Sequence, residues 1–180
     1  MNIFVVDEDP IKAAQSLCDA HVVKMVVESC QLLSTQDRLD GHNEGRYKLT
    51  HVNHPCRKCL KNEWNKSWLE LHLFGLLQEY FLRYGKTHKC IHMFRSLWSW
   101  DAGAAYMLNK QQDVLSWIAL TTLPQCMPEE FKVSSDIPGY VPCIGQTVLA
   151  YRNYYRYKAK TLKRFTYTKR EPPEWLKGSL

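Results

Sequence analysis

Apolar residues recur at a spacing of about 3.6 positions along most of the chain, which predicts an almost entirely helical protein. Before the first helical pattern, residues 2–6 form a short apolar stretch that we expect to be a strand or an extended arm. Long helices are expected over residues 10–34 and 57–84, and a last one over about 145–161. We therefore predict one all-α domain spanning residues 1–180, with a short extended segment at its N-terminus.

Capping residues define several of the predicted boundaries. Asp9 followed by Pro10 predicts the start of the first helix, because Asp is a favoured N-cap and Pro a favoured first helical residue. Gly85 predicts the end of the second long helix. Three further segments are less regular: a short aromatic helix over 89–100, a helix over 101–119 and a proline-rich loop over 121–145.

Composition excludes several classes of protein. Hydrophobic residues make up 45% and charged residues 23% of the 180 positions, which is typical of a globular domain and not of a disordered chain. No apolar run is long enough for a membrane span, and the N-terminus turns acidic too early for a signal peptide. The seven cysteines, an odd number, are expected to be free thiols in the cytoplasm.

The positive charge is concentrated near the C-terminus. The net charge is +6, and residues 151–180 carry nine Lys or Arg residues and only two acidic residues. Basic side chains interleaved with tyrosines can neutralise phosphates and stack on bases, so residues 151–170 are predicted to contact DNA. An amphipathic helix that buries its tyrosine rings is the alternative. The candidate contacts are Arg152, Tyr154, Tyr155, Arg156 and Lys158.

A narrow polar ridge lies on the otherwise apolar first helix. Its four residues fall within an arc of roughly 80° at about 100° per residue. A carboxylate, a lysine and an imidazole on one ridge suit proton transfer or imine chemistry. The alternative is an ion pair between residues four apart, flanked by solvated neighbours. The ridge consists of His21, Lys24, Glu28 and Gln31.

A second cluster has the spacing of zinc ligands. His51, His54, Cys56 and Cys59 place four soft donors in nine residues. We favour the other interpretation, a loop leading into a helix whose two cysteines are small core residues. No metal is therefore expected, although a zinc-stapled binding module stays an alternative.

The order of these motifs resembles the phage pyrimidine-dimer DNA glycosylase family, also called endonuclease V. The resemblance is carried by an N-terminal extended segment, by Asp19-x-His21 and by Glu28 seven residues later, and it is strongest over residues 1–60. A longer pattern is similar to a group of phage proteins often placed near that family. It comprises HVVKM with E and QLL over 21–33, NHPC at 53–56, RYGKTHK at 83–89, MPEEFK at 127–132 and YRNYY at 151–155.

The resemblance implies a compact all-α repair enzyme that needs no metal or organic cofactor. In that family the terminal α-amine attacks C1′ of the damaged nucleotide, the base leaves, and an imine intermediate undergoes β-elimination. The glutamate that supports proton transfer matches Glu28, and the motif histidine matches His21. Here Asn2 follows the initiator, a pairing that usually leaves Met1 in place. The nucleophile would then be the Met1 amine or Lys24, and without either Glu28 could activate water.

We accordingly expect a DNA glycosylase for a damaged or modified pyrimidine, with possible AP-lyase activity, acting on double-stranded DNA and not on a membrane. Asn53 and His54 are expected to complete the site beside the ridge. A pyrimidine-modifying enzyme on the same scaffold and a non-enzymatic nucleic-acid-binding module are the alternatives. The sequence leaves the oligomeric state open.

Overall fold

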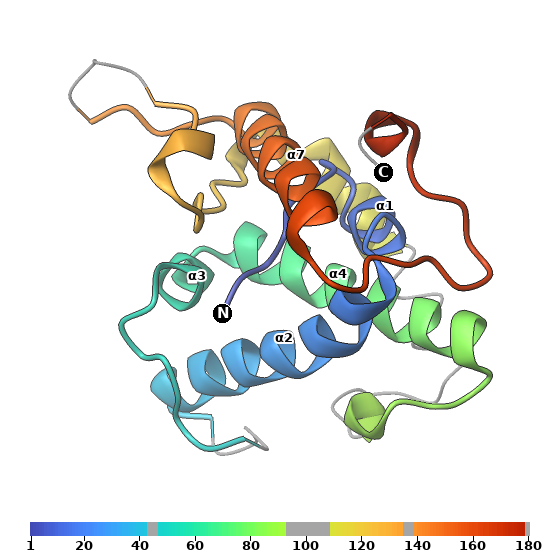
Figure 1. Cartoon of the computed structure of the whole chain (residues 1–180). Coiled ribbons are helices and arrows are strands. Elements are labelled where there is room, and N and C mark those ends of the chain that lie inside the picture. The colour runs from blue at the N-terminus through green and yellow to red at the C-terminus, as the bar shows by residue number, and fades with distance from the viewer. Residues whose placement is uncertain (43–46, 93–108, 135–138, 179–180) are drawn as a thin grey trace.

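The computed structural model describes the whole chain except residues 43–46, 93–108, 135–138 and 179–180. The described residues form α-helices and 3-10 turns and contain no strand, which confirms the all-α fold (Figure 1). The α-helices with defined ends are α1 (Pro10–Gln15), α2 (Asp19–Leu39), α3 (Pro55–Lys58), α4 (Glu63–Tyr84) and α7 (Ile144–Thr161), and residues 109–116 are also helical. The 3-10 turns are η1 (Cys59–Lys61), η2 (Lys89–Ile91), η3 (Ile118–Leu120), η4 (Glu129–Phe131) and η5 (Glu174–Leu176).

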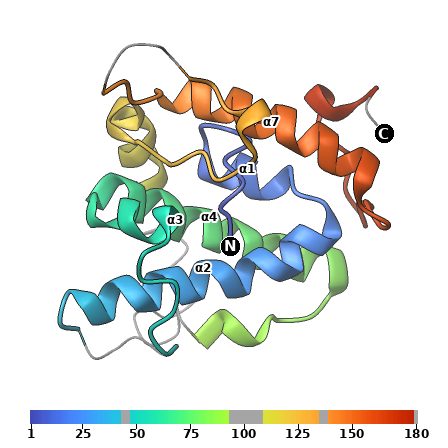
Figure 2. The same ribbon diagram turned by 60° about the vertical axis from the view of Figure 1, so that its left-hand side comes forward.

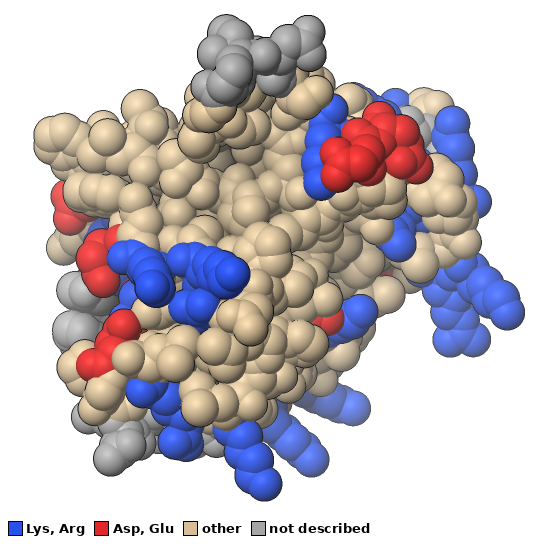
Figure 3. All heavy atoms as spheres, turned by 90° about the vertical axis from the view of Figure 1, so that its left-hand side faces the viewer, with Lys and Arg blue, Asp and Glu red and all other residues tan. Residues whose placement is uncertain are grey.

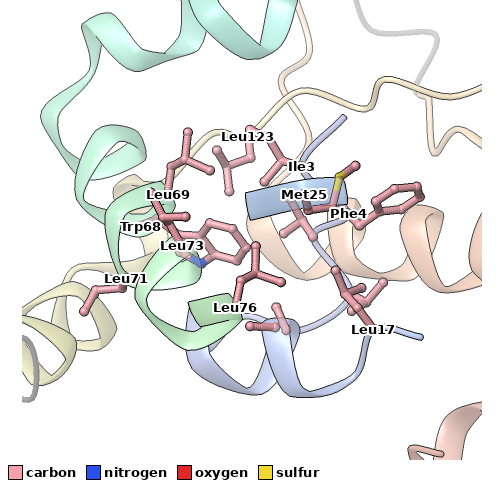
Figure 4. Close-up of a cluster of buried hydrophobic side chains, with 14 of the residues drawn as sticks. Ile3, Phe4, Leu17, Met25, Trp68, Leu69, Leu71, Leu73, Leu76 and Leu123 are labelled. Carbon is pink, nitrogen blue, oxygen red and sulfur yellow. The ribbon is translucent and has the colours of Figure 1, made fainter. Parts of the chain in front are cut away.

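The N-terminal segment runs through the interior of the protein. Helices α1 and α2 pack against α4, and the extended residues 1–9 pass between these helices and α7 (Figures 1 and 2). Ile3 and Phe4 lie in the core with Met25, Trp68 and surrounding leucines (Figure 4). The expected extended arm is therefore present, and its burial fixes where the start of the chain lies.

Phe4 holds an unusual backbone conformation in this arm. Its φ of 55° lies in the left-handed region, which is costly for a residue with a Cβ atom. The ring is buried and stacks on His21 with a centroid distance of 4.4 Å. Burial of this ring offsets the backbone strain and holds the arm against α2.

The first predicted helix is wrong in its extent, because it is split into α1 and α2. Asp9 caps α1 as expected, accepting the N–H of Ile11 at 2.8 Å. The chain then leaves helical geometry, and Cys18 adopts an extended conformation. The N–H of Cys18 bonds the Tyr155 hydroxyl at 2.8 Å, and that of Asp19 bonds the Thr166 carbonyl at 2.9 Å. These partners come from the far end of the chain, so local periodicity could not predict the break.

The second predicted helix also begins with a break. Residues 55–61 form α3 and η1, and the long helix α4 starts only after Asn62. The Asn62 side chain accepts the N–H groups of Trp64 and Asn65, which makes it the N-cap of α4. The predicted C-terminal end is confirmed, since Gly85 is left-handed with a φ of 64°.

The later segments agree with expectation where they are described. Helix α7 spans the range predicted for the last helix, and residues 121–134 are largely irregular. Residues 109–116 are helical, whereas only the turn η2 is described within the helix expected over 89–100. Positions 93–108 of these two predicted helices lie outside the described residues. Among the described helices, none is both long and apolar enough to cross a membrane.

A buried ionic network ties the C-terminal segment to α2 and α4. Arg83 is almost fully buried and bonds Asp19 and Glu79, each at 3.0 Å. Arg170 also bonds Glu79, and Asp19 accepts bonds from the threonines at 166 and 168. Burial raises the pKa of Asp19, but these hydrogen bonds outweigh it and hold that pKa below its usual value. The aspartate of the Asp19-x-His21 motif therefore has a structural role.

Candidate active site

The terminal amine and Glu28 meet where the extended arm crosses α2. Oε2 of Glu28 lies 3.9 Å from the Met1 amine and accepts the backbone N–H of Asn2 at 2.9 Å. Its other oxygen, Oε1, lies 3.3 Å from Nζ of Lys24. The Glu28 side chain is only 13% exposed, so its charge is partly desolvated and faces two amines and one amide. An amine next to a positioned carboxylate is the arrangement that nucleophilic amine chemistry requires.

Asn2 fixes the position of this amine through its side chain. Its Nδ2 donates to the Cys126 carbonyl at 2.8 Å, and its Oδ1 accepts the hydroxyl of buried Tyr151 at 2.7 Å. The same hydroxyl accepts the N–H of Cys126 at 3.1 Å. The first two residues are thus held by α7 and by the irregular segment before it. Sequence reasoning had no signal for these contacts, because each depends on the tertiary path of the arm.

The polar ridge on α2 divides into two parts. Lys24 is exposed, Glu28 and Gln31 are half-buried, and His21 is buried. The ion pair between Lys24 and Glu28 expected from their spacing is present. Glu28 also contacts Met1 and Asn2 at the start of the chain. The ridge therefore contains the ion pair of the structural interpretation and the carboxylate beside an amine of the catalytic interpretation.

His21 lies in an aromatic cluster away from solvent. Its Nδ1 is 2.8 Å from the Tyr155 hydroxyl, and its ring stacks on Phe4. Burial, together with the charges of Lys158 and Lys24, lowers the pKa of His21 to about 4. The imidazole is therefore neutral at physiological pH. Because it is enclosed by Phe4 and Tyr155, we interpret it as a residue that positions the arm and α7.

Asn53 and His54 lie at the start of α3. Asn53 is exposed, whereas His54 is half-buried and caps the helix by accepting the Cys56 N–H at its Nδ1, at 3.2 Å. Burial and the nearby terminal amine lower the pKa of His54, and Glu28 opposes this shift. The charges of the terminal amine and of Glu28 therefore both act on the pKa of His54. His54 lies near the polar ridge, as predicted.

Helix α7 has a buried tyrosine face and a basic outer face. Tyr155 is fully buried and accepts the Cys18 N–H, so it cannot stack on a base as expected without leaving the core. Arg152 bonds the Val6 carbonyl and Asp7, and Arg156 bonds the Trp175 carbonyl. These residues hold the fold together, as the amphipathic interpretation of the segment expected.

Other side chains of this segment are open to a partner. Tyr154 is half-buried, and Nζ of Lys158 lies over its ring, 5.2 Å from the ring centroid. Lys160, Lys163 and Arg164 are exposed at and after the end of α7. On the face of the molecule shown in Figure 3, Lys and Arg side chains gather along the lower and right-hand edges and in a further group at the left, while acidic side chains lie mainly at the upper right and the far left. A polyanion could approach such a surface over several basic groups.

The zinc-like sequence cluster does not gather as its spacing suggested. His51 is exposed with a left-handed φ of 51°, and the Cys59 thiol donates to the Cys56 carbonyl. His54 and Cys56 instead lie beside Cys126, and one donor atom from each of the three lies within 4.8 Å of the others. Sequence reasoning missed Cys126, which is distant along the chain and lies in an irregular segment.

Comparison with known proteins places the first half of the chain. A family model described as pyrimidine dimer DNA glycosylase matches residues 1–92. The matched range includes the arm, α2 and the start of α3, and hence every group around Glu28 except those of α7 and the segment before it. No curated protein and no solved structure matches the chain.

Proposed function

The chain belongs to the pyrimidine dimer DNA glycosylase family, and on this premise we propose that it excises a damaged or modified pyrimidine from double-stranded DNA through its terminal amine and Glu28. The observation that carries the proposal is the position of the Met1 amine, 3.9 Å from a carboxylate oxygen that is fixed on α2 and largely shielded from solvent.

The proposed reaction begins when the unprotonated Met1 nitrogen attacks C1′ of the target nucleotide. The bond from nitrogen to C1′ forms as the glycosidic bond breaks, and the base departs with the bonding electrons and takes up a proton. Glu28 accepts the proton lost by the amine and stabilises the positive charge that develops on the sugar. The C1′–O4′ bond then breaks as O4′ takes up the proton held by Glu28, which gives an imine between the amine and C1′ and returns Glu28 to its carboxylate form.

The lyase step follows from this imine. Loss of a proton from C2′ expels the 3′ phosphate by β-elimination and cuts the strand. We assign the removal of that proton to Glu28, whose Oε2 lies 3.9 Å from the Met1 nitrogen. Hydrolysis of the imine then releases the amine for another turnover.

Met1 is the preferred nucleophile over Lys24. The Met1 side chain is 3% exposed and packs against the core, so the amine is held in place, whereas the Lys24 side chain is 67% exposed. A fixed amine loses less conformational entropy at the transition state. If Met1 is removed, the Asn2 nitrogen becomes the amine, and that atom lies 2.9 Å from Glu28.

We assign DNA binding to the exposed part of residues 151–170 and to the turn at Asn53. The exposed cations after α7 can neutralise phosphates, while Tyr154 offers a partly exposed ring. Reaching C1′ inside a duplex requires kinking or flipping of a nucleotide, which costs a few kcal/mol and must be offset by such contacts.

The experiment that tests this function is base release from defined duplexes. Oligonucleotides carrying one cyclobutane pyrimidine dimer, one abasic site or one modified pyrimidine are incubated with the full chain. Base release and strand cleavage are then measured separately. Excision from the dimer or from a modified pyrimidine supports the proposal. A change in base mass with an intact glycosidic bond would instead favour a pyrimidine-modifying enzyme, and binding without either reaction would leave a binding module.

A further inference from the structure

Three potential metal ligands from two distant parts of the chain converge next to the active site. His54 and Cys56 lie at the start of α3, and Cys126 lies in the segment before η4. The two sulfur atoms are 3.3 Å apart, and one nitrogen of His54 lies within 4.8 Å of both. We propose that His54, Cys56 and Cys126 bind one thiophilic divalent cation of the zinc class.

The spacing of the donors fits tetrahedral coordination. With Zn–S bonds of about 2.3 Å, two thiolates on a tetrahedral ion lie about 3.8 Å apart, and a thiolate and an imidazole nitrogen slightly less. The observed sulfur separation therefore has to open by about half an ångström, and the imidazole has to move in. Side-chain rotations of that size leave the backbone of both segments where it is.

The chemistry of the donors also favours such an ion. Two sulfur ligands and one imidazole select zinc-class ions over magnesium or calcium, which prefer oxygen. The Cys56 thiol donates to Sγ of Cys126, which lowers the pKa of Cys126 and raises that of Cys56. Binding would release both thiol protons to solvent and replace this sulfur–sulfur contact with two metal–thiolate bonds.

Three protein ligands leave the fourth position of a tetrahedral ion for water or another group. The Cys126 carbonyl bonds the Asn2 side chain, so a cation held by Cys126 would lie close to the start of the chain. Such an ion would join the α3 turn to the segment that positions Asn2. Its expected effect on the fold is therefore a more firmly held N-terminal arm.

Metal binding is measured on the reduced full-length chain, kept reduced by a phosphine that does not bind metals. Zinc is titrated in competition with a chromophoric chelator, and cobalt is used to record thiolate-to-metal charge transfer. We expect one ion per chain, a charge-transfer band of two thiolates and a higher unfolding temperature with zinc. Absence of binding by the folded, reduced chain would overturn the proposal.

Two variants remove one ligand each. Cys126→Ser removes a half-buried thiol, and His54→Asn removes the imidazole while keeping an N-cap residue for α3. Since even outer-shell partners change metal affinity by 10–100-fold, each change should weaken zinc binding at least ~100-fold. The matched control, Cys143→Ser, changes an exposed thiol at the start of α7 and should bind as the wild type does.

Variant folding is checked by circular dichroism and thermal unfolding without metal. Wild-type affinity in folded Cys126→Ser or His54→Asn, or an equal loss in Cys143→Ser, would contradict the assigned ligands. Glu28→Gln should bind zinc normally, because Glu28 supplies no ligand. Metal binding is thereby tested separately from base excision.

Discussion

The Met1 amine lies 3.9 Å from Oε2 of Glu28, although Met1 begins the chain and Glu28 lies in the middle of α2. The contact exists because residues 3–6 are buried beneath α7, which brings the first residue against α2. The N–H of Asn2 donates to the same oxygen and fixes the carboxylate. This geometry leads to the following expectations.

Replacing Glu28 with Gln should lower single-turnover base excision by 10²–10⁴-fold, the usual contribution of a general acid or base. DNA affinity should change less than about threefold, because none of the phosphate contacts that we assign involves Glu28. Excision kinetics and fluorescence anisotropy measure the two quantities. Glu130→Gln, the same change at an exposed glutamate of η4, is the matched control. Unfolding of Glu28→Gln would show instead that the carboxylate is needed for structure.

Acidification should destabilise the protein through His21. The pKa of His21 is about 4 in the fold and about 6.5 when unfolded, so below pH 6.5 the unfolded chain binds the proton first. Stability is therefore complete above pH 6.5 and is lost as the pH falls toward 4, by about 3 kcal/mol. Urea unfolding across this range should show a steeper loss in the wild type than in His21→Asn. Equal slopes would contradict the buried, neutral imidazole.

Gly75 marks the closest approach of α4 to α1. A Cβ atom there would lie 2.9 Å from Cβ of Ala14 and 3.3 Å from Cα of Ile11. These two atoms are fixed to the backbone of α1 and cannot rotate away. Gly75→Ala should therefore destabilise the fold by about 1–3 kcal/mol. Gly145→Ala on α7 is the control, because a Cβ there meets only a carboxylate oxygen of the flexible Glu8 side chain, at 3.1 Å. The free energy of urea unfolding measures both, and no loss for Gly75→Ala would refute the close packing.

Removing the hydroxyl of Tyr155 should affect stability before DNA binding. Tyr155→Phe leaves the Cys18 N–H and the His21 Nδ1 without this partner, at a cost of about 1–3 kcal/mol. Below the unfolding transition its DNA affinity should equal that of the wild type. A selective loss of affinity in a fully stable variant would show that the hydroxyl contacts DNA, which contradicts the purely structural role.

The exposed cations after α7 should set the salt dependence of DNA binding. Changing Lys160, Lys163 and Arg164 together to Gln should weaken binding and reduce the slope of log K against log salt by up to about 3. Lys86→Gln, an exposed cation in the turn after α4, should leave the slope unchanged. An unaltered slope in the triple variant would place the DNA on another surface.

Local sequence determined much of the helical architecture. The Asp9 cap, the left-handed Gly85 and the extent of α7 follow from residues within one turn of each position. The break at Cys18 does not, because the N–H of Cys18 bonds the Tyr155 hydroxyl and the N–H of Asp19 bonds the Thr166 carbonyl. A helical period continues across such a break, so only the folded chain reveals it.

The candidate site was predictable in part for the same reason. The spacing on α2 identified Glu28 and its pairing with Lys24, both of which are local features. The roles of Asn2, Tyr151 and Cys126 depend on the arm crossing the core between segments far apart in sequence. The tyrosines near the C-terminus had two physically reasonable environments, and burial of Tyr155 distinguishes them.

The most direct measurement of the central proposal is borohydride trapping on a duplex that contains one abasic site. The protein is incubated with the duplex and reduced, and the covalent adduct is located by intact mass and peptide mapping. We expect one adduct at the α-amine of the first residue, strongly diminished in Glu28→Gln and retained in Lys24→Gln. An adduct at Lys24 would reassign the nucleophile. No adduct, with DNA binding intact, would contradict amine catalysis at this site.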